Sequence, residues 1–363
     1  MNKIVKLLDC TLRDGGYVND WRFGYNTIVN TIERLAVAGV DVIEVGFLDD
    51  RQKFDINRTI QPDTGSFDKI LENVDRGQSL LFGMIDYGTC DITNIAPCSQ
   101  STLDGIRVIF KRPKMREAIA FSKQLIDLGY FVSLNMVSIT SYSDRDILDF
   151  SNLANEIQPF AVSMVDTYGL MHKEEMLNYF FLLDHNLDKR IQIGYHSHNN
   201  FQLAYANTCE LVKRNSTHAL IVDGALYGMG KSAGNAPLEL LAMYLNENYE
   251  KQYNINQILE IIDSVILRIY QKHYWGYNLL YFISANSNCH PNYVNYLLKK
   301  NTLSVPAINK IIGTIPEDSK LNYSQPLIEQ LYVMYQGSIN EVRNEKSQLN
   351  HILHGQKVLL LGP

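Results

Sequence analysis

The sequence lacks the features that mark membrane, disulfide-rich or nucleic-acid-binding proteins. No apolar run approaches the roughly 20 residues needed to cross a bilayer, and the apolar part of the N-terminus is too short for a signal peptide. The 33 basic and 39 acidic residues give a net charge of -6 without a long Lys/Arg cluster. We therefore expect a cytoplasmic protein that binds neither nucleic acid nor membrane.

Paired cysteines are also absent. The five cysteines are scattered and form no CxxC pair: Cys10, Cys90, Cys98, Cys209 and Cys289. Neither a disulfide framework nor a zinc knuckle is expected from this pattern, which suits a reducing compartment.

No fixed-period repeat is present, but short apolar runs alternate with longer helix-like segments. The apolar runs predict strands at 4–9, 42–47, 80–85, 105–110, 131–137, 160–165, 191–196 and 219–223. Helix-like segments follow each of them, for example at 24–38, 114–129, 145–156, 174–184, 201–214 and 236–248. Eight such units in about 250 residues match the size of a (β/α)8 barrel.

The predicted fold class is therefore α/β, a (β/α)8 TIM barrel followed by a small helical C-terminal domain. An open doubly wound sheet is disfavoured because the first turn, "TLRDGGY", lacks the G-x-G-x-x-G pattern of dinucleotide-binding members. We place the barrel at 1–250 and the helical domain at 251–355. Residues 356–363 resemble either the start of a truncated further α/β domain or a C-terminal tail.

Polar side chains gather where the predicted strands end, which is where barrels carry their chemistry. Glu44 and Asn135 lie within their strands, and the others lie at or after strand ends: Asp9, Arg13, Asp14, Asp86, Asp166, His196, His198, Asp223 and Asn235. Among them we expect Glu44, Asn135 and Asp166 to contact a substrate.

The triplet "HSH" is the sharpest local signal for a metal site. His196 and His198 lie two positions apart on an extended segment, so their side chains point to the same side. Alone, such a pair also occurs as a hydrogen-bonded structural feature. With Asp14 and Asn235 at neighbouring strand ends, two nitrogens and one or two oxygens suit Mn2+, and tolerate Mg2+, Co2+ or Zn2+.

Arg13 precedes the proposed ligand Asp14, and two glycines follow. A surface ion pair would contribute little. An arginine beside a metal instead suits an enolate or a carboxylate, because its forked donors are fixed and always charged. We expect Gly15 and Gly16 to free the turn for substrate.

Three motifs, "DCTLRDGG", "GYHSHNNFQLAYAN" and "VDGALYGMGKSAGNAPLELL", together resemble the metal-dependent pyruvate aldolase and carbon–carbon lyase superfamily, which includes hydroxymethylglutaryl-CoA lyase and isopropylmalate synthase. The 4-hydroxy-2-oxovalerate aldolase branch is the most similar. The resemblance implies that Asp14, His196 and His198 bind the metal, with Asn235 joining them in some members. It also implies that Arg13 stabilises a pyruvate enolate and that Tyr281 belongs to the active site.

One position departs from that pattern. The aldolases place a histidine base shortly after the Arg-Asp pair, where this chain has Tyr17. A tyrosine has a reference pKa of about 10 and is a poor base near neutrality. A water on the metal or His290 could take the proton instead, or the reaction differs. Packing over the barrel mouth is the alternative role for Tyr17.

The predicted activity is cleavage or formation of a C–C bond in a 4-hydroxy-2-oxo acid. A Claisen-type condensing enzyme acting on an acyl-CoA is one alternative, and a metal-binding barrel without turnover is another. A Schiff-base aldolase is disfavoured because five of the predicted strands contain no lysine, and Lys111 only follows the fourth.

An aldehyde dehydrogenase is a candidate partner. The apolar surface near 255–270 would serve homo-oligomerisation or pack on the barrel.

Overall fold

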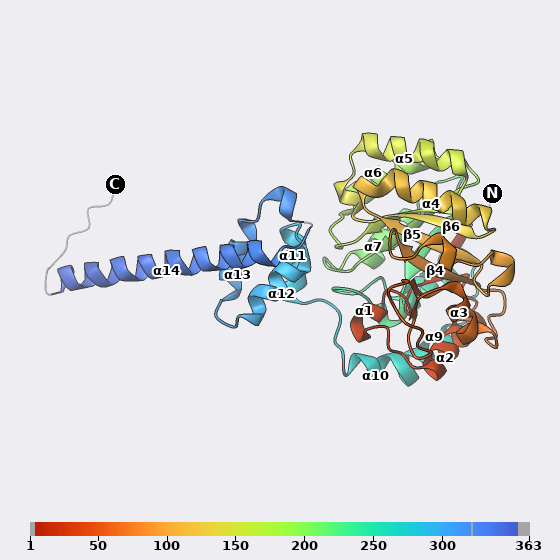
Figure 1. Ribbon diagram of the computed structural model, residues 1–363, viewed down its shortest axis with the longest axis horizontal. Coiled ribbons are helices and arrows are strands. Elements are labelled where there is room, and N and C mark those ends of the chain that lie inside the picture. The colour runs from red at the N-terminus through yellow and green to blue at the C-terminus, as the bar shows by residue number, and fades with distance from the viewer. Residues whose placement is uncertain (1–3, 321, 355–363) are drawn as a thin grey trace. The chain divides into compact units, whose positions relative to one another are not determined.

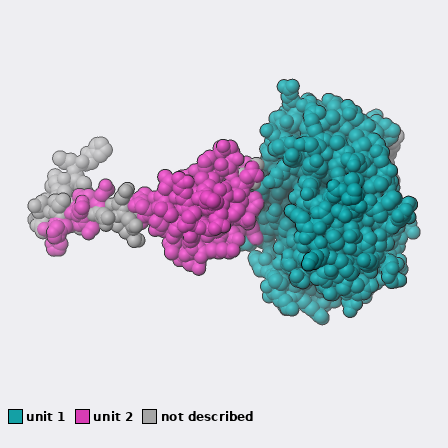
Figure 2. Space-filling model, viewed as in Figure 1, with its two compact units in different colours: residues 1–278 teal, residues 279–363 magenta. Residues whose placement is uncertain are grey.

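A computed structural model describes residues 4–320 and 322–354, so the expected segment 356–363 lies outside the described residues. The chain divides into two compact units, which are residues 1–278 and residues 279–363 (Figure 2). No helix in the described part of the chain is long and apolar enough to cross a membrane.

The first unit is built on eight parallel strands that close into a barrel, which confirms the predicted fold class (Figure 1). Closure comes from the pairing of the first strand with both the second and the last. The barrel strands are β1 (Val5–Asp9), β2 (Val42–Leu48), β4 (Leu80–Asp86), β5 (Gly105–Phe110), β6 (Phe131–Met136), β7 (Ala161–Asp166), β8 (Gln192–Ser197) and β9 (Leu220–Gly224). Their residues are almost all buried, as expected of parallel strands covered on both faces.

Helices alternate with the strands and cover the outside of the barrel, except between β4 and β5, where the expected helix is replaced by two short 3-10 turns, Ile92–Asn94 and Cys98–Gln100. The helices are α2 (Tyr25–Val37), α3 (Thr64–Leu71), α4 (Met115–Asp127), α5 (Asp144–Ile157), α6 (Lys173–Asn186), α7 (Ala204–Val212) and α8 (Leu238–Asn248). The N-termini of some helices are determined by local sequence. Ser143 and Asp146 form a capping box at the start of α5, and the Asp63 carboxylate caps the start of α3. The ranges predicted from the sequence do not include α3, the short α1 (Gly16–Asn19) or the two-residue β3 (Ile60–Gln61).

The first unit extends past the residue 250 expected from the sequence. Helix α9 (Ile255–Ile261) continues through a π-helical turn, Ile262–Ile266, into α10 (Leu267–Tyr270). Four isoleucines of this segment join the core cluster of the barrel unit: Ile258, Ile261, Ile262 and Ile266. The apolar face near 255–270 therefore packs on the barrel.

The second unit is helical, as expected, and has a separate small core. Its helices are α11 (Leu279–Asn286), α12 (Pro291–Lys299), α13 (Val305–Gly313) and α14 (Gln325–Leu353). His290 is the N-cap of α12, where its Nδ1 accepts a hydrogen bond from the Asn292 backbone N–H at 3.2 Å. This capping role accounts for the position of His290.

Candidate active site

The loop after β1 positions Arg13 and Asp14 through a tight turn. The Cys10 carbonyl accepts hydrogen bonds from the backbone N–H groups of Arg13 and Asp14, at 3.2 and 2.8 Å. A Cβ added to Gly15 would lie 2.2 Å from the Thr11 carbonyl oxygen, and one added to Gly16 would lie 2.0 Å from the Trp21 indole. The expectation that these glycines make room for substrate is thus corrected: the chain's own atoms fill that space.

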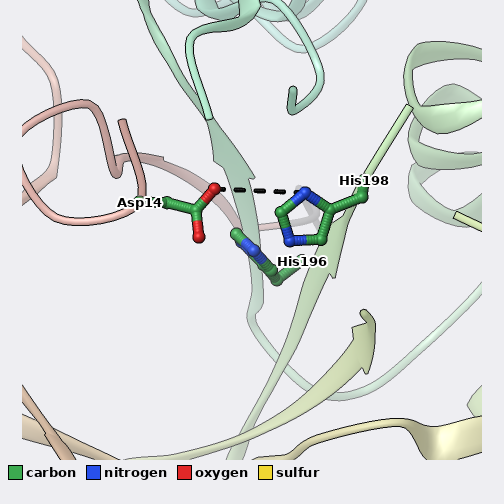
Figure 3. Close-up of side chains that lie close together, drawn as sticks. All are labelled: Asp14, His196 and His198. Atoms are coloured by element: carbon green, nitrogen blue, oxygen red, sulfur yellow. Dashed lines mark ion pairs between the residues drawn. The ribbon is translucent and has the colours of Figure 1, made fainter. Parts of the chain in front are cut away.

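Asp14, His196 and His198 come together at the carboxyl ends of the strands (Figure 3). Each is buried, and each offers a ligand atom that lies within 4.8 Å of the other two. His196 belongs to β8 and His198 directly follows it, whereas Asp14 follows β1. Two imidazoles and a carboxylate are a suitable donor set for a divalent metal ion.

Both imidazole rings are oriented through Nδ1. His196 Nδ1 lies 3.0 Å from Asp223 Oδ2, and His198 Nδ1 lies 3.2 Å from the Gly234 carbonyl oxygen. When Nδ1 donates to these acceptors, Nε2 of each ring is left to bind a metal. The arrangement is the usual support for metal-binding histidines.

The protonation states also suit a metal. Burial lowers the pKa of His198 to about 4, so this imidazole is neutral near pH 7. Burial opposes ionisation of Asp14, but His198 and Arg13 outweigh it and hold the pKa of this carboxyl below its ordinary value. A neutral imidazole and an ionised carboxylate are the forms that bind cations.

The hydrogen bonds of Asn235 test whether the site suits a divalent metal ion. Its Nδ2 donates to Asp14 Oδ2 at 2.8 Å and to the Met229 carbonyl at 3.0 Å. Its buried Oδ1 has no hydrogen-bond partner among the described residues. A buried amide oxygen without a partner is costly, and a cation held by Asp14 and the histidines would satisfy it. The residues present therefore fit a divalent metal.

Arg13 is held rigidly by two carboxylates. Its Nε donates to Glu44 Oε2 at 2.8 Å and its Nη1 to Asp14 Oδ1 at 2.7 Å. Nη2 makes no hydrogen bond in the described part of the chain. The guanidinium is thus fixed beside the proposed metal ligands with one donor nitrogen available.

Arg107 is not among the predicted site residues, although an arginine inside the apolar run "GIRVIF" is a recognisable signal. It lies on β5, is 1% exposed, and contacts Glu44 at 3.2 Å and Asp223 at 2.7 Å. A continuous row of buried ion pairs results, made of Asp14, Arg13, Glu44, Arg107 and Asp223, and Asp223 also contacts Nδ1 of His196. This row connects Asp14 to the carboxylate that orients His196, so both of its ends reach the proposed metal site.

The three residues expected to contact substrate are all bonded within the protein. Glu44 pairs with the two arginines described above. Asn135, with its amide oriented to satisfy both groups, donates to Ser133 Oγ at 2.9 Å and accepts from Arg107 Nη2 at 2.8 Å. Asp166 accepts from the backbone N–H groups of Leu170 and Met171, at 2.9 and 3.1 Å. Substrate contact by these residues stays a prediction.

Tyr17 lies at the mouth of the barrel and is 42% exposed. Its ring packs edge to face on Trp21 and Phe47, with centroid distances of 4.7 and 6.0 Å. Its hydroxyl makes no hydrogen bond to the described residues. Burial on its inner side and the charge of Asp14 raise the pKa of this phenol above its ordinary value, so it is neutral at pH 7.

Tyr281 belongs to α11 of the second unit. It is half-buried there, and burial raises its pKa. Its expected place in the active site stays a prediction.

The fold and the site together define a class: a (β/α)8 barrel equipped at its carboxyl end to hold a divalent cation. The chain belongs to the HMGL-like family, whose family model matches residues 4–265. This family comprises divalent-metal-dependent aldolases, lyases and condensing enzymes, which supports an enzymatic role. The resemblance drawn from the three motifs is confirmed.

Individual relatives are distant. The 4-hydroxy-2-oxovalerate aldolase of Marinomonas sp. (strain MWYL1) is 25% identical over 279 residues, which cover 74% of this chain and 78% of that protein. The oxaloacetate decarboxylase of Mycobacterium tuberculosis is 24% identical over 253 residues, 66% of this chain and 69% of that protein.

Solved structures share the fold. The N-terminal domain of a Bacteroides vulgatus protein described as an aldolase matches with a TM-score of 0.69 and 24% identity, over 84% of this chain and 99% of that one. The HMG-CoA lyase of Bacillus subtilis matches with a TM-score of 0.59 and 14% identity, over 74% of this chain and 94% of that one. Both are barrels of the same architecture.

Proposed function

We propose that this protein is a divalent-metal-dependent aldolase that cleaves or forms the C3–C4 bond of a 4-hydroxy-2-oxo acid. The observation that carries the proposal is the buried group of Asp14, His196 and His198 beside the fixed Arg13 guanidinium. A cation in this group would supply Lewis-acid polarisation of the 2-oxo group, and we expect Mn2+ from the mixed nitrogen and oxygen donors.

The names of the relatives support an enolate-forming site. Cleavage of a 4-hydroxy-2-oxo acid leaves the enolate of pyruvate, and so does decarboxylation of oxaloacetate. The Marinomonas relative is named for the first of these activities and the Mycobacterium tuberculosis relative for the second. A site that stabilises this one enolate would serve both reactions.

Arg13 would stabilise that enolate. When the C3–C4 bond breaks, its electrons move onto C3 and the 2-oxo oxygen becomes negatively charged. Because Glu44 and Asp14 hold two nitrogens of Arg13, the guanidinium needs no reorganisation as the charge develops. Its remaining nitrogen, Nη2, would donate to the enolate oxygen.

Tyr17 would act as a proton donor. Since its pKa is raised, the phenol keeps its proton at neutral pH and is a poor acceptor for the proton of the 4-hydroxyl. It can return a proton to C3 after the aldehyde leaves, or donate a hydrogen bond to a reacting oxygen. The 4-hydroxyl proton would pass to a different group.

The test combines metal content with product release. The purified full-length protein, before and after EDTA treatment, is incubated with a panel of 4-hydroxy-2-oxo acids, and pyruvate is measured with lactate dehydrogenase. We expect pyruvate release that EDTA abolishes and Mn2+ restores. Bound metal with no release from any member of the panel would contradict the proposal and favour a barrel without turnover. Consumption of an acyl-CoA without aldol cleavage would favour the condensing-enzyme alternative.

A further inference from the structure

Lys231 lies at the barrel mouth, in the loop between β9 and α8. Its backbone N–H donates to Asp14 Oδ2 at 3.1 Å, which fixes this loop against the proposed metal site. Its half-buried side chain extends over Tyr17, and its Nζ lies 5.1 Å from the centroid of that ring. A lysine ammonium is thereby held beside the proposed reaction centre.

The surroundings of this ammonium favour an anionic ligand. Among the described residues, no carboxylate oxygen lies within 4 Å of Lys231 Nζ. Burial lowers the pKa of Lys231; Asp14 and Asp86 attract its charge, whereas Lys111 and Arg13 repel it. A half-buried cation without a close counter-ion is unfavourable, and an incoming carboxylate or phosphate would relieve that cost.

Two cationic groups thus occupy different places in one site. Arg13 lies with the metal ligands and is paired with Glu44 and Asp14. Lys231 instead reaches the aromatic cluster of Tyr17, Trp21 and Phe47, which comes from the loop after β1 and from β2. The 2-oxo acid end of a substrate would explain the position of Arg13. It would give the Lys231 ammonium no ligand.

We infer that Lys231 binds a second anionic group, carried on the aldehyde-derived half of the substrate. The inference rests on the proposed aldolase function and makes the substrate a dianionic 4-hydroxy-2-oxo acid. The second anion is a carboxylate or a phosphate, both of which an ammonium binds through charge-assisted hydrogen bonds. Lys231 is then the residue that sets specificity for the aldehyde.

The test runs the metal-loaded full-length protein in the direction of aldol addition. Pyruvate is combined with an uncharged aldehyde (propionaldehyde), a carboxylated one (succinic semialdehyde) or a phosphorylated one (glyceraldehyde 3-phosphate). We expect the wild type to prefer one of the two anionic aldehydes, and the preferred one identifies the anion. Lys231→Met should lower kcat/KM for that aldehyde about 10- to 100-fold, mainly through KM, and leave propionaldehyde nearly unchanged.

Three comparisons make the result specific. Lys231→Arg should retain most of the preference, since it keeps the charge, and Lys123→Met, on the exposed face of α4, should behave as wild type. Inhibition by oxalate, which mimics the pyruvate enolate, should be the same in Lys231→Met and wild type. An equal loss for charged and uncharged aldehydes, or weaker oxalate inhibition, would overturn the inference by placing Lys231 on the pyruvate half.

Other outcomes separate this inference from the function on which it rests. Activity that favours propionaldehyde in the wild type would overturn the inference and leave the aldolase function standing. No addition with any aldehyde would overturn both. Trapping of pyruvate on Lys231 by borohydride would also overturn it, because the lysine would then form a Schiff base.

Discussion

At the scale of single residues, His196 and His198 depend on different acceptors. Asp223 orients His196, whereas a backbone carbonyl orients His198. Asp14 receives hydrogen bonds from Arg13, Asn235 and the Lys231 backbone. Each proposed ligand is therefore held in place by neighbours that are separate from the metal itself.

His196→Ala should lose metal affinity and activity together. The variant removes a nitrogen ligand from a site with few donors, so we expect at least about a 100-fold weaker metal affinity, measured by titration with Mn2+. His185→Ala, on the exposed surface of α6, is the matched control and should bind metal as the wild type does. Unchanged metal affinity in His196→Ala would refute the ligand assignment.

Arg13→Lys should retain metal but lose about 100- to 1000-fold in kcat. A lysine keeps the charge but cannot bond Glu44 and Asp14 while also presenting a fixed donor to an enolate. Steady-state kinetics and metal analysis of the same preparation check this. Normal turnover in the variant would remove Arg13 from the proposed enolate role.

At the scale of elements, the strands follow from sequence because each is a continuous apolar run buried on both faces. All eight predicted strands exist, with ends within one residue of those expected. The missed elements are short: α3 has eight residues and β3 has two. The two residues of β3 pair with Phe47 and Leu48 of β2, a contact that a local pattern does not encode, whereas the Asp63 cap of α3 is local.

Arg107→Met should destabilise the barrel by about 3–5 kcal/mol. It leaves Glu44 and Asp223 buried without a cationic partner on β5, and uncompensated buried charges are costly. Denaturant titration of metal-free protein measures this loss. Arg112→Met, which removes an exposed pairing with Asp146 just after the same strand, should change stability by less than about 1 kcal/mol. If both substitutions lowered the free energy of unfolding equally, the row of buried ion pairs would not be what stabilises the barrel.

At the scale of the whole molecule, the chain has two separate cores. The barrel unit includes the helical segment up to α10, and Trp275 donates from its indole Nε1 to the Tyr227 carbonyl at 3.0 Å. The second unit packs its own isoleucines between α12, α13 and α14. The natural division of the chain is therefore after Asn278.

A fragment ending at Asn278 should fold and bind metal with the affinity of the full chain. A fragment ending at Glu250 should unfold at a lower temperature, because it loses the four core isoleucines of α9 and the π-helical turn. Thermal melts and Mn2+ titrations of both fragments check this. Aldolase activity of the longer fragment also tests Tyr281: undiminished activity would exclude a catalytic role for this residue.

The sequence by itself determined the barrel and the family and predicted the ligand residues, since apolar runs and motifs depend on near neighbours along the chain. Only the tertiary structure decided how these residues are supported. Arg107 meets Asp223, 116 positions away, and Lys231 meets Asp14, 217 positions away, because closing the barrel brings the strand ends together. Such contacts depend on strand register and loop path, which no local pattern specifies. The space beside Gly15 and Gly16, by contrast, is filled by near neighbours in the chain, the Thr11 carbonyl and the Trp21 indole.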